Sequence, residues 1–175
     1  MIFQGLIRLC WRHPYHLREG LSSTYGNTSK QTVNAIYDGG NYTDVFEQDL
    51  IEARKQIVVS SPELTKSKVD RFLYLVKERQ EAGCKVTVIT MDPQHISYGS
   101  PEFCLGLIDA MRENGIQVMV RDEVAEHFAI IDSELVWHGG MNLLGKEDAW
   151  DNLMRIKSAQ VAAELLEIGL KGERG

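Results

Sequence analysis

The amino-acid sequence predicts an α/β fold, with a mixed but mainly parallel sheet that is covered by helices on both faces. Short apolar runs rich in β-branched residues alternate with longer segments of helical periodicity. Two passages, EAGCKVTVIT and ENGIQVMVRD, repeat one arrangement: the end of a helix, a glycine and then a buried strand. Strands that alternate with helices of this length require crossover connections, which favour parallel strands buried on both faces.

Seven strands are predicted from the β-branched and apolar runs, at 32–37, 56–60, 85–90, 116–120, 127–132, 134–139 and 153–156. Asp132-Ser133-Glu134 predicts a tight turn between the fifth and the sixth strand.

Four helices fill the remaining segments. The first begins at Thr43 or Asp44, either of which can cap it. The second ends at Gly83, and the third begins at Ser100-Pro101, with proline at the favoured first helical position. Ser158 caps the last helix. The apolar faces of these helices consist of Val45, Phe46, Leu50 and Ala53, then Val69, Phe72, Leu73 and Val76, then Cys104, Leu107, Ile108 and Met111, and finally Val161, Leu165 and Ile168.

Residues 1–31 differ from the rest, and we interpret them as an N-terminal arm and polar linker that precede a domain over 32–175. Arg8 to Arg18 interleaves basic residues with Trp11 and Tyr15, whereas Gly20 to Gln31 is rich in Ser, Thr and Gly. The arm either contacts nucleic acid or forms a short helix that docks on the domain or belongs to a larger neighbour.

Composition and charge exclude several classes of protein. The 175 residues carry a net charge of −6, which argues against a uniformly basic nucleic-acid-binding surface but not against a local basic cleft. No apolar run approaches the roughly 18 residues of a membrane span. Cys10, Cys84 and Cys104 show neither disulfide pairing nor zinc spacing, so we expect a cytoplasmic protein. The histidines show no metal-ligand pattern with acids or cysteines, and we expect no metal and no cofactor.

The most informative segment is Glu126 to Asn142, EHFAIIDSELVWHGGMN. A histidine precedes an apolar run, Asp132 ends that run, and Gly139-Gly140-Met141-Asn142 follows. This segment resembles the signature of the phospholipase D-like (HKD) phosphodiesterase superfamily, H-x-K-x-x-x-x-D followed by G-S/G-x-N. The order of elements from Thr32 to Ile168 is also similar to one half of such an enzyme.

The resemblance implies a specific chemistry. Members of the superfamily use one histidine as the nucleophile on phosphorus and a second histidine, from a second copy of the motif, as the acid for the leaving group. Lysines and the G-S/G-x-N segment hold the phosphate oxygens, and no metal is required. This chain carries one copy of the motif, so the resemblance implies a homodimer or a pairing with a second domain of the same kind.

Two alignments with the signature are open. Anchoring on Asp132 and the Gly-Gly-x-Asn turn keeps the spacing and places Ala125 at the histidine position and His127 at the lysine position. Anchoring on His127 instead places Ala129 at the lysine position and Glu134 at the aspartate position, with two residues missing before the glycine pair. Both alignments lose the motif lysine.

The resemblance also assigns roles to individual residues. The candidate catalytic residues are His127, Asn142 and Asp132; the candidate substrate-binding residues are Gly139, Gly140 and His138; the candidates that support the histidine are Asp151 and Asn152. His127 and His138 can also be ordinary structural residues. Three basic residues after the Ser60-Ser61-Pro62 turn either approach a phosphate backbone or lie on a solvated helix face: Lys66, Lys68 and Arg71.

Two functions follow from these residues. The first is a metal-independent phosphodiesterase, a nuclease rather than a lipase, similar to the phospholipase D-like domains that accompany bacterial helicases and restriction-type systems. The second is a catalytically inactive module of the same fold that binds nucleic acid, DNA above all, or mediates dimerisation. The missing lysine and Ala125 motivate the second function.

Overall fold

The computed structural model describes residues 34–96, 99–146 and 151–170. The chain divides into two units, Met1–Gln31 and Thr32–Gly175, and all described residues belong to the second. The predicted arm and linker therefore lie outside the described residues. No helix in the described part of the chain has the length and apolar character needed to cross a membrane.

The described residues form a seven-stranded sheet and four helices. The strands are β1 (Ala35–Asp38), β2 (Gln56–Ser60), β3 (Lys85–Met91), β4 (Gln117–Arg121), β5 (His127–Ile131), β6 (Leu135–Gly139) and β7 (Asn152–Lys157). The helices are α1 (Thr43–Glu52), α2 (Lys66–Glu81), α3 (Pro101–Glu113) and α4 (Ala159–Leu170). Each predicted strand and helix is present.

The strand order is β1-β7-β6-β5-β2-β3-β4. Parallel pairing joins β2 to β3 and β3 to β4, whose connections contain α2 and α3. The other four pairings are antiparallel, yet five of the seven strands run in one direction, because only β5 and β7 oppose the rest. The predicted class, a mixed and mainly parallel α/β sheet, is confirmed.

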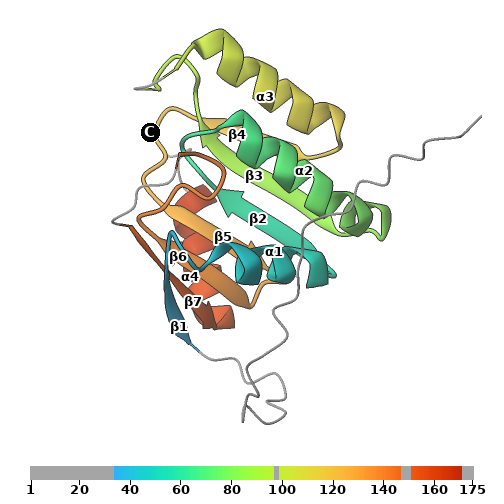
Figure 1. Cartoon of the computed structure of the whole chain (residues 1–175), viewed down its shortest axis with the longest axis vertical. Helices are drawn as coiled ribbons and strands as arrows, with labels where there is room; N and C mark the ends of the chain where they lie inside the picture. The colour runs from blue at the N-terminus through green and yellow to red at the C-terminus, as the bar shows by residue number, and fades with distance from the viewer. Residues whose placement is uncertain (1–33, 97–98, 147–150, 171–175) are drawn as a thin grey trace, which may run out of the picture. The chain divides into compact units, whose positions relative to one another are not determined.

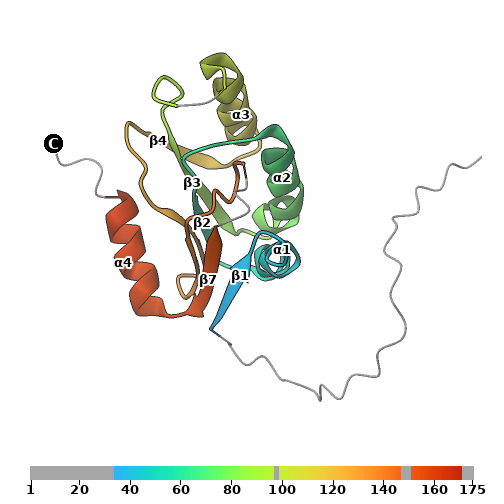
Figure 2. The ribbon, with the colours of Figure 1, turned by 60° about the vertical axis from the view of Figure 1, so that its left-hand side comes forward.

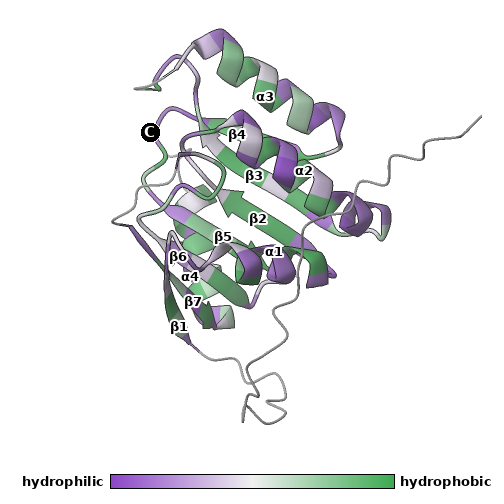
Figure 3. Cartoon of the chain, viewed as in Figure 1, coloured by the Kyte–Doolittle hydropathy of each residue, from purple (hydrophilic) through white to green (hydrophobic). Residues whose placement is uncertain are grey.

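Helices cover both faces of the sheet, as Figures 1 and 2 show: α1, α2 and α3 lie on one face and α4 on the other. Strand side chains alternate between two cores. In β5, Ala129 and Ile131 belong to the larger core under the three helices, whereas Phe128 and Ile130 pack with Ala162 and Leu165 of α4. The central strands are accordingly apolar on both sides (Figure 3).

Local signals in the sequence explain where most helices begin and end. The Ser100 hydroxyl accepts a hydrogen bond from the Phe103 amide, and Pro101 opens α3. The Ser158 hydroxyl accepts one from the Val161 amide at the start of α4. Gly83 and Gly115 follow α2 and α3 with φ angles of 91° and 78°, which residues with a Cβ rarely adopt.

Two predicted details are wrong. Tyr42, not Thr43 or Asp44, precedes α1 and makes no capping bond through its side chain. The Tyr42 ring is 1% exposed, and its burial sets the start of the helix. Ile168 is 54% exposed instead of buried. The helix approaches the sheet there through Gly169, where an added Cβ would lie 3.0 Å from Cζ of Phe128.

A buried ion pair fastens α1 to the sheet. The Asp49 carboxylate, 7% exposed, accepts hydrogen bonds from the Trp137 indole and from Nε and a terminal nitrogen of Arg155, each at 2.8 Å. The bonds to Asp49 raise the pKa of Arg155 above its usual value. Asp49 therefore links α1 to β6 and β7 and is fully used in the fold.

Candidate functional site

A pocket of about 840 Å³ lies at one edge of the sheet. Its walls come from the starts of α2 and α3, the first residue of β5, the segment after β6 and Asp151. Ligands of open α/β sheets commonly bind at such an edge, where loops from several strands meet. His127, Gly140, Asn142 and Asp151, which the sequence analysis singles out, all line this pocket.

His127 enters the pocket from the start of β5. It lies on the same face of the strand as Ala129, toward α2 and α3, and it is half-buried. Its Nδ1 lies 2.6 Å from the Gly140 carbonyl oxygen. A carbonyl only accepts, so Nδ1 carries the proton and Nε2 of the neutral ring holds an unprotonated lone pair. This tautomer is the one that a nucleophilic histidine needs.

Gly139 and Gly140 allow the backbone to pass close to the start of β7. A Cβ on Gly139 would lie 1.9 Å from the Asn152 carbonyl oxygen, and a Cβ on Gly140 would lie 2.7 Å from Oδ1 of Asp151. The Gly140 amide also donates to the Asn152 carbonyl, at 3.2 Å. Only glycine fits at the first position, and at the second the missing side chain leaves room for the Asp151 carboxylate beside Gly140.

Asn142 joins two loops at the floor of the pocket. Its Oδ1 accepts a hydrogen bond from the Glu63 amide at 3.2 Å, and the residue also lines the pocket. The same two loops are joined by Ser61, whose hydroxyl accepts from the Leu144 amide at 3.1 Å. Gly145 fits against Glu63, because a Cβ there would lie 2.8 Å from the Glu63 carbonyl oxygen.

Asp132 lies at the other end of β5, roughly 16 Å along the strand from His127. Its carboxylate accepts hydrogen bonds from three consecutive backbone amides, those of Arg54, Lys55 and Gln56, at 2.6 to 3.1 Å. Asp132 does not line the pocket. Its contacts hold the turn after β5 against the start of β2, so its effect on His127 is through the placement of the strand.

His138 faces away from His127. Its β6 position pairs with Phe128, which belongs to the core under α4, whereas His127 pairs with Gly139 on the face toward α2 and α3. Its Nε2 lies 2.9 Å from a carboxylate oxygen of Glu126. The expectation that His138 and His127 share one site is not supported by this pairing. Asn152 lies in β7 and contributes its carbonyl, not its side chain, to the contact with Gly140.

Two lysines also line the pocket. They are Lys146, in the segment after β6, and Lys66, at the start of α2. Lys66 also contacts Asp70 at 2.6 Å on the surface. Lys68 and Arg71 instead contact α1, through the Tyr42 hydroxyl and the Glu47 carboxylate. Lys146 is missed by the sequence analysis, because nothing in its spacing relates it to His127.

Backbone amides add positive potential to the pocket. Thr65 precedes α2 and makes no capping bond through its side chain, so the first-turn amides of this 16-residue helix are not satisfied by a cap. Cys104 lines the same wall, but burial and the Glu63 carboxylate raise the pKa of its thiol above 9.0. The thiol is therefore protonated near neutral pH and is a poor nucleophile.

Comparison with known proteins finds one matching family and several solved structures of similar fold. The family described as "Cardiolipin synthase, PLD-like domain" matches residues 46–168. Nuc from Salmonella typhimurium, described as a phospholipase D family member, is 12% identical, with a TM-score of 0.63 over 80% of this chain and 94% of that one. NucT from Helicobacter pylori is 15% identical, with a TM-score of 0.59 over the same shares.

A third similar structure is TrmBL2, described as an archaeal chromatin protein with a novel mode of DNA binding. It is 18% identical, with a TM-score of 0.54 over 78% of this chain and 50% of that one. At these identities the three structures show a common fold. No curated protein matches the sequence. Since the matching family spans well over half of the chain and the fold agrees with it, this chain belongs to the phospholipase D-like domain family.

Proposed function

We propose that this protein is a phosphodiesterase that cleaves nucleic-acid phosphodiester bonds through His127, by a reaction that does not depend on a metal ion. The observation that carries the proposal is the contact between His127 Nδ1 and the Gly140 carbonyl oxygen, 2.6 Å apart. It fixes the tautomer that presents Nε2 as the reactive nitrogen of a residue that lines the pocket.

The reaction has two displacement steps. In the first, Nε2 of His127 attacks phosphorus, a P–N bond forms, and the P–O bond to the leaving group breaks while a second histidine protonates the leaving oxygen. In the second, that histidine takes a proton from water, the water oxygen attacks phosphorus, and the P–N bond breaks. Histidine and acid return to their starting states.

The pocket supports this chemistry by stabilising negative charge on phosphoryl oxygens. Lys146 and Lys66 supply positive charge, the amides at the start of α2 supply a helix N-terminus, and Asn142 supplies amide hydrogens. These donors take over the task of the lysine that both alignments lose. Asp132 is assigned the role of positioning β5, and Gly139 and Gly140 the role of shaping the backbone around the phosphate.

Among the described residues that line this pocket, His127 is the one histidine, and His138 lies on the other face of the sheet. We assign the role of acid to His127 of a second copy of this chain, in a homodimer whose two pockets join. A second domain of the same fold from another protein can supply the residue in the same way.

Nucleic acid is the favoured substrate class over a phospholipid. Phe103 of α3 lines the pocket and is 52% exposed, which provides a ring on which a base can stack next to the phosphate site. The DNA-binding description of TrmBL2 gives independent support from the same fold. The name of the matching family makes phospholipids the comparison substrate in any assay.

The test is cleavage of labelled single- and double-stranded DNA in excess EDTA, with vesicles of anionic phospholipid as the comparison substrate. We expect the wild type to cut DNA and His127→Ala to fall to the rate without enzyme. His138→Ala is the matched control, since it removes a histidine from the opposite face and is expected to retain activity. Equal rates for wild type and His127→Ala at matched oligomeric state contradict the proposal.

A second candidate function is a catalytically inactive module that holds nucleic acid, either alone or within a helicase or restriction-type system. Ala125 at the histidine position of the spacing-preserving alignment favours it, together with the similarity to TrmBL2. In this case neither protein cleaves DNA, and both wild type and His127→Ala bind it with an affinity that falls as salt rises.

A further inference from the structure

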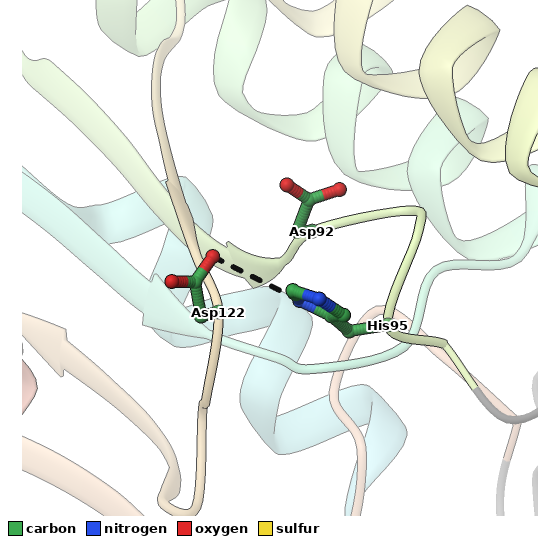
Figure 4. A group of neighbouring side chains, drawn as sticks. All are labelled: Asp92, His95 and Asp122. Carbon is green, nitrogen blue, oxygen red and sulfur yellow. Dashed lines mark ion pairs between the residues drawn. The ribbon is translucent and has the colours of Figure 1, made fainter.

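A second group of polar side chains lies at the ends of β3 and β4, outside the pocket that contains His127. Met91 and Arg121, the last residues of these strands, pair in register, so Asp92 and Asp122 follow at the same edge of the sheet. His95 belongs to the turn that begins at Asp92. Figure 4 shows the two carboxylates and the imidazole close together, with Asp92 and His95 on one connection and Asp122 on the other.

Backbone contacts fix two of the three positions. The Asp92 amide donates to the Arg121 carbonyl at 2.7 Å, which ties the two connections together. The His95 amide donates to the Asp92 carbonyl at 2.8 Å, and Oδ1 of Asp92 accepts from the Gln94 amide at 2.8 Å. The turn therefore orients the Asp92 carboxylate and places the backbone of His95 next to it before any ligand arrives.

The donor atoms of the three side chains lie slightly farther apart than the ligand atoms of a bound metal ion. One donor atom from each of the three residues lies within 4.8 Å of the other two, and His95 Nδ1 is 3.8 Å from Oδ1 of Asp122. Zinc bonds of about 2.0–2.2 Å in a tetrahedron hold their donor atoms roughly 3.3 Å apart. The His95 and Asp122 side chains are 55% and 85% exposed, so they can close this difference by rotating in solvent.

We propose that Asp92, His95 and Asp122 bind one divalent cation of the zinc class. An imidazole nitrogen and two carboxylates suit Zn²⁺ and its first-row neighbours better than Mg²⁺ or Ca²⁺, which prefer oxygen ligands alone. The two carboxylates balance the charge of the cation, and water completes the tetrahedron. The cation joins the connection after β3 to the connection after β4.

The site is independent of the proposed phosphodiesterase chemistry. None of its three residues lines the pocket of His127, although Ile96, next to His95, does. The bound cation therefore stabilises the connection that forms one wall of that pocket without entering it. The sequence alone predicts no metal, because its histidines show no metal-ligand pattern with acids or cysteines. Asp122 comes from another strand, so no spacing along the chain relates it to His95.

The test is titration of the EDTA-treated and dialysed full chain with ZnCl₂, under reducing conditions, by isothermal calorimetry. We expect the wild type to show a binding step that is at least about ten-fold weaker or absent in both His95→Ala and Asp122→Asn. His138→Ala is the control, since it removes the histidine of the other exposed histidine–carboxylate pair and is expected to leave this step unchanged.

Thermal unfolding provides a second readout. In EDTA the two variants are expected to unfold at the wild-type temperature, and added Zn²⁺ is expected to raise that temperature for the wild type but not for them. No Zn²⁺ binding by the wild type, or a wild-type isotherm retained by His95→Ala, overturns the proposal and leaves an exposed ion pair only. His127→Ala retains the Zn²⁺ step whether or not the phosphodiesterase proposal holds.

Discussion

The hydrogen bond between the His127 ring and the Gly140 carbonyl determines which nitrogen of the imidazole can react. It comes from the backbone, so it persists in any variant that keeps the glycine pair and the start of β7 in place. In the proposed reaction, His127 thus needs no carboxylate partner of its own to hold its ring. Asp151, which lies beside Gly140, instead adds a negative charge to the lining of the pocket.

The lysines that line the pocket are proposed to stabilise the phosphoryl oxygens, and this role can be tested residue by residue. Lys146→Ala is expected to lower kcat about 10²–10³-fold, because one fixed donor to the phosphoryl oxygens is removed, and Lys146→Arg is expected to recover part of the loss. Steady-state cleavage of DNA in EDTA measures it. Lys157→Ala is the control, since Lys157 pairs with Glu134 at the far end of β7. An unchanged kcat in Lys146→Ala would assign the role to Lys66 alone.

Among the elements, β5 connects the reactive residue to the fold. It begins at His127 in the pocket and ends at the turn of Asp132 and Ser133, both with positive φ angles of 54° and 64°. Aspartate tolerates this conformation and also accepts the three amides at the start of β2. The turn therefore sets the register of β5 against β2 and, through it, the position of His127.

Asp132→Ala is expected to lower the free energy of unfolding by about 1–3 kcal/mol, because the hydrogen bonds to three backbone amides and a residue suited to positive φ are lost together. Asp132→Asn keeps an acceptor and the backbone preference and is expected to lose less. Urea unfolding measures both. Glu134→Ala, which removes an exposed ion pair, is the control. A stability of Asp132→Ala equal to that of the control would show that the turn holds without its carboxylate.

The buried thiols predict how stability changes at alkaline pH. Burial raises the pKa of Cys84 and of Cys104 above 9.0, with Asp132 and Glu63 adding to the respective shifts. Above pH 9 the unfolded chain therefore loses thiol protons that the folded chain retains, and stability falls as pH rises. A Cys84→Ala/Cys104→Ala variant is expected to lose less stability than the wild type between pH 8.5 and about 10 in urea unfolding. Parallel curves for the two proteins would contradict this.

The sequence predicts where strands and helices lie along the chain better than it predicts which of them pair or pack together. Runs such as QIVVS define β2 at its observed bounds, because β-branched residues and flanking helix signals act locally. The antiparallel pairing of β2 with β5, by contrast, joins segments separated by two strands and two helices, and no local signal specifies it. The exposure of Ile168 depends on how closely Gly169 approaches Phe128, which is also a long-range contact.

In the candidate site, too, the sequence predicts what depends on nearby residues and not what depends on contacts between distant segments. The motif places His127, Gly140 and Asn142 near one another in the chain, and the fold brings them to one pocket. Residue spacing alone does not reveal that His138 points to the opposite face, since that follows from the register of β6 on β5. Lys146 reaches the pocket because Ser61 and Asn142 join its segment to the start of α2, a contact between distant loops.

At the scale of the whole molecule, the described residues of one copy bring one histidine, His127, to the pocket, whereas the proposed reaction needs two. In the proposed dimer, whose two pockets join, His127 of the second copy supplies the other histidine. An excess of the His127→Ala chain is then expected to suppress the activity of wild-type chains after subunit exchange, because mixed dimers lack either the nucleophile or the acid. Cleavage in proportion to the wild-type chain alone, with exchange verified by native mass spectrometry, would contradict a shared site.

The most direct test of the central claim is to trap the covalent intermediate on His127. We predict that rapid alkaline quenching of the protein with a labelled DNA substrate, followed by peptide mass spectrometry, finds an acid-labile nucleotidyl adduct on the peptide that carries His127. The His138→Ala protein is expected to form the same adduct, and the His127→Ala protein none. DNA cleavage that proceeds without an adduct on His127, or with one on another residue, would contradict the account.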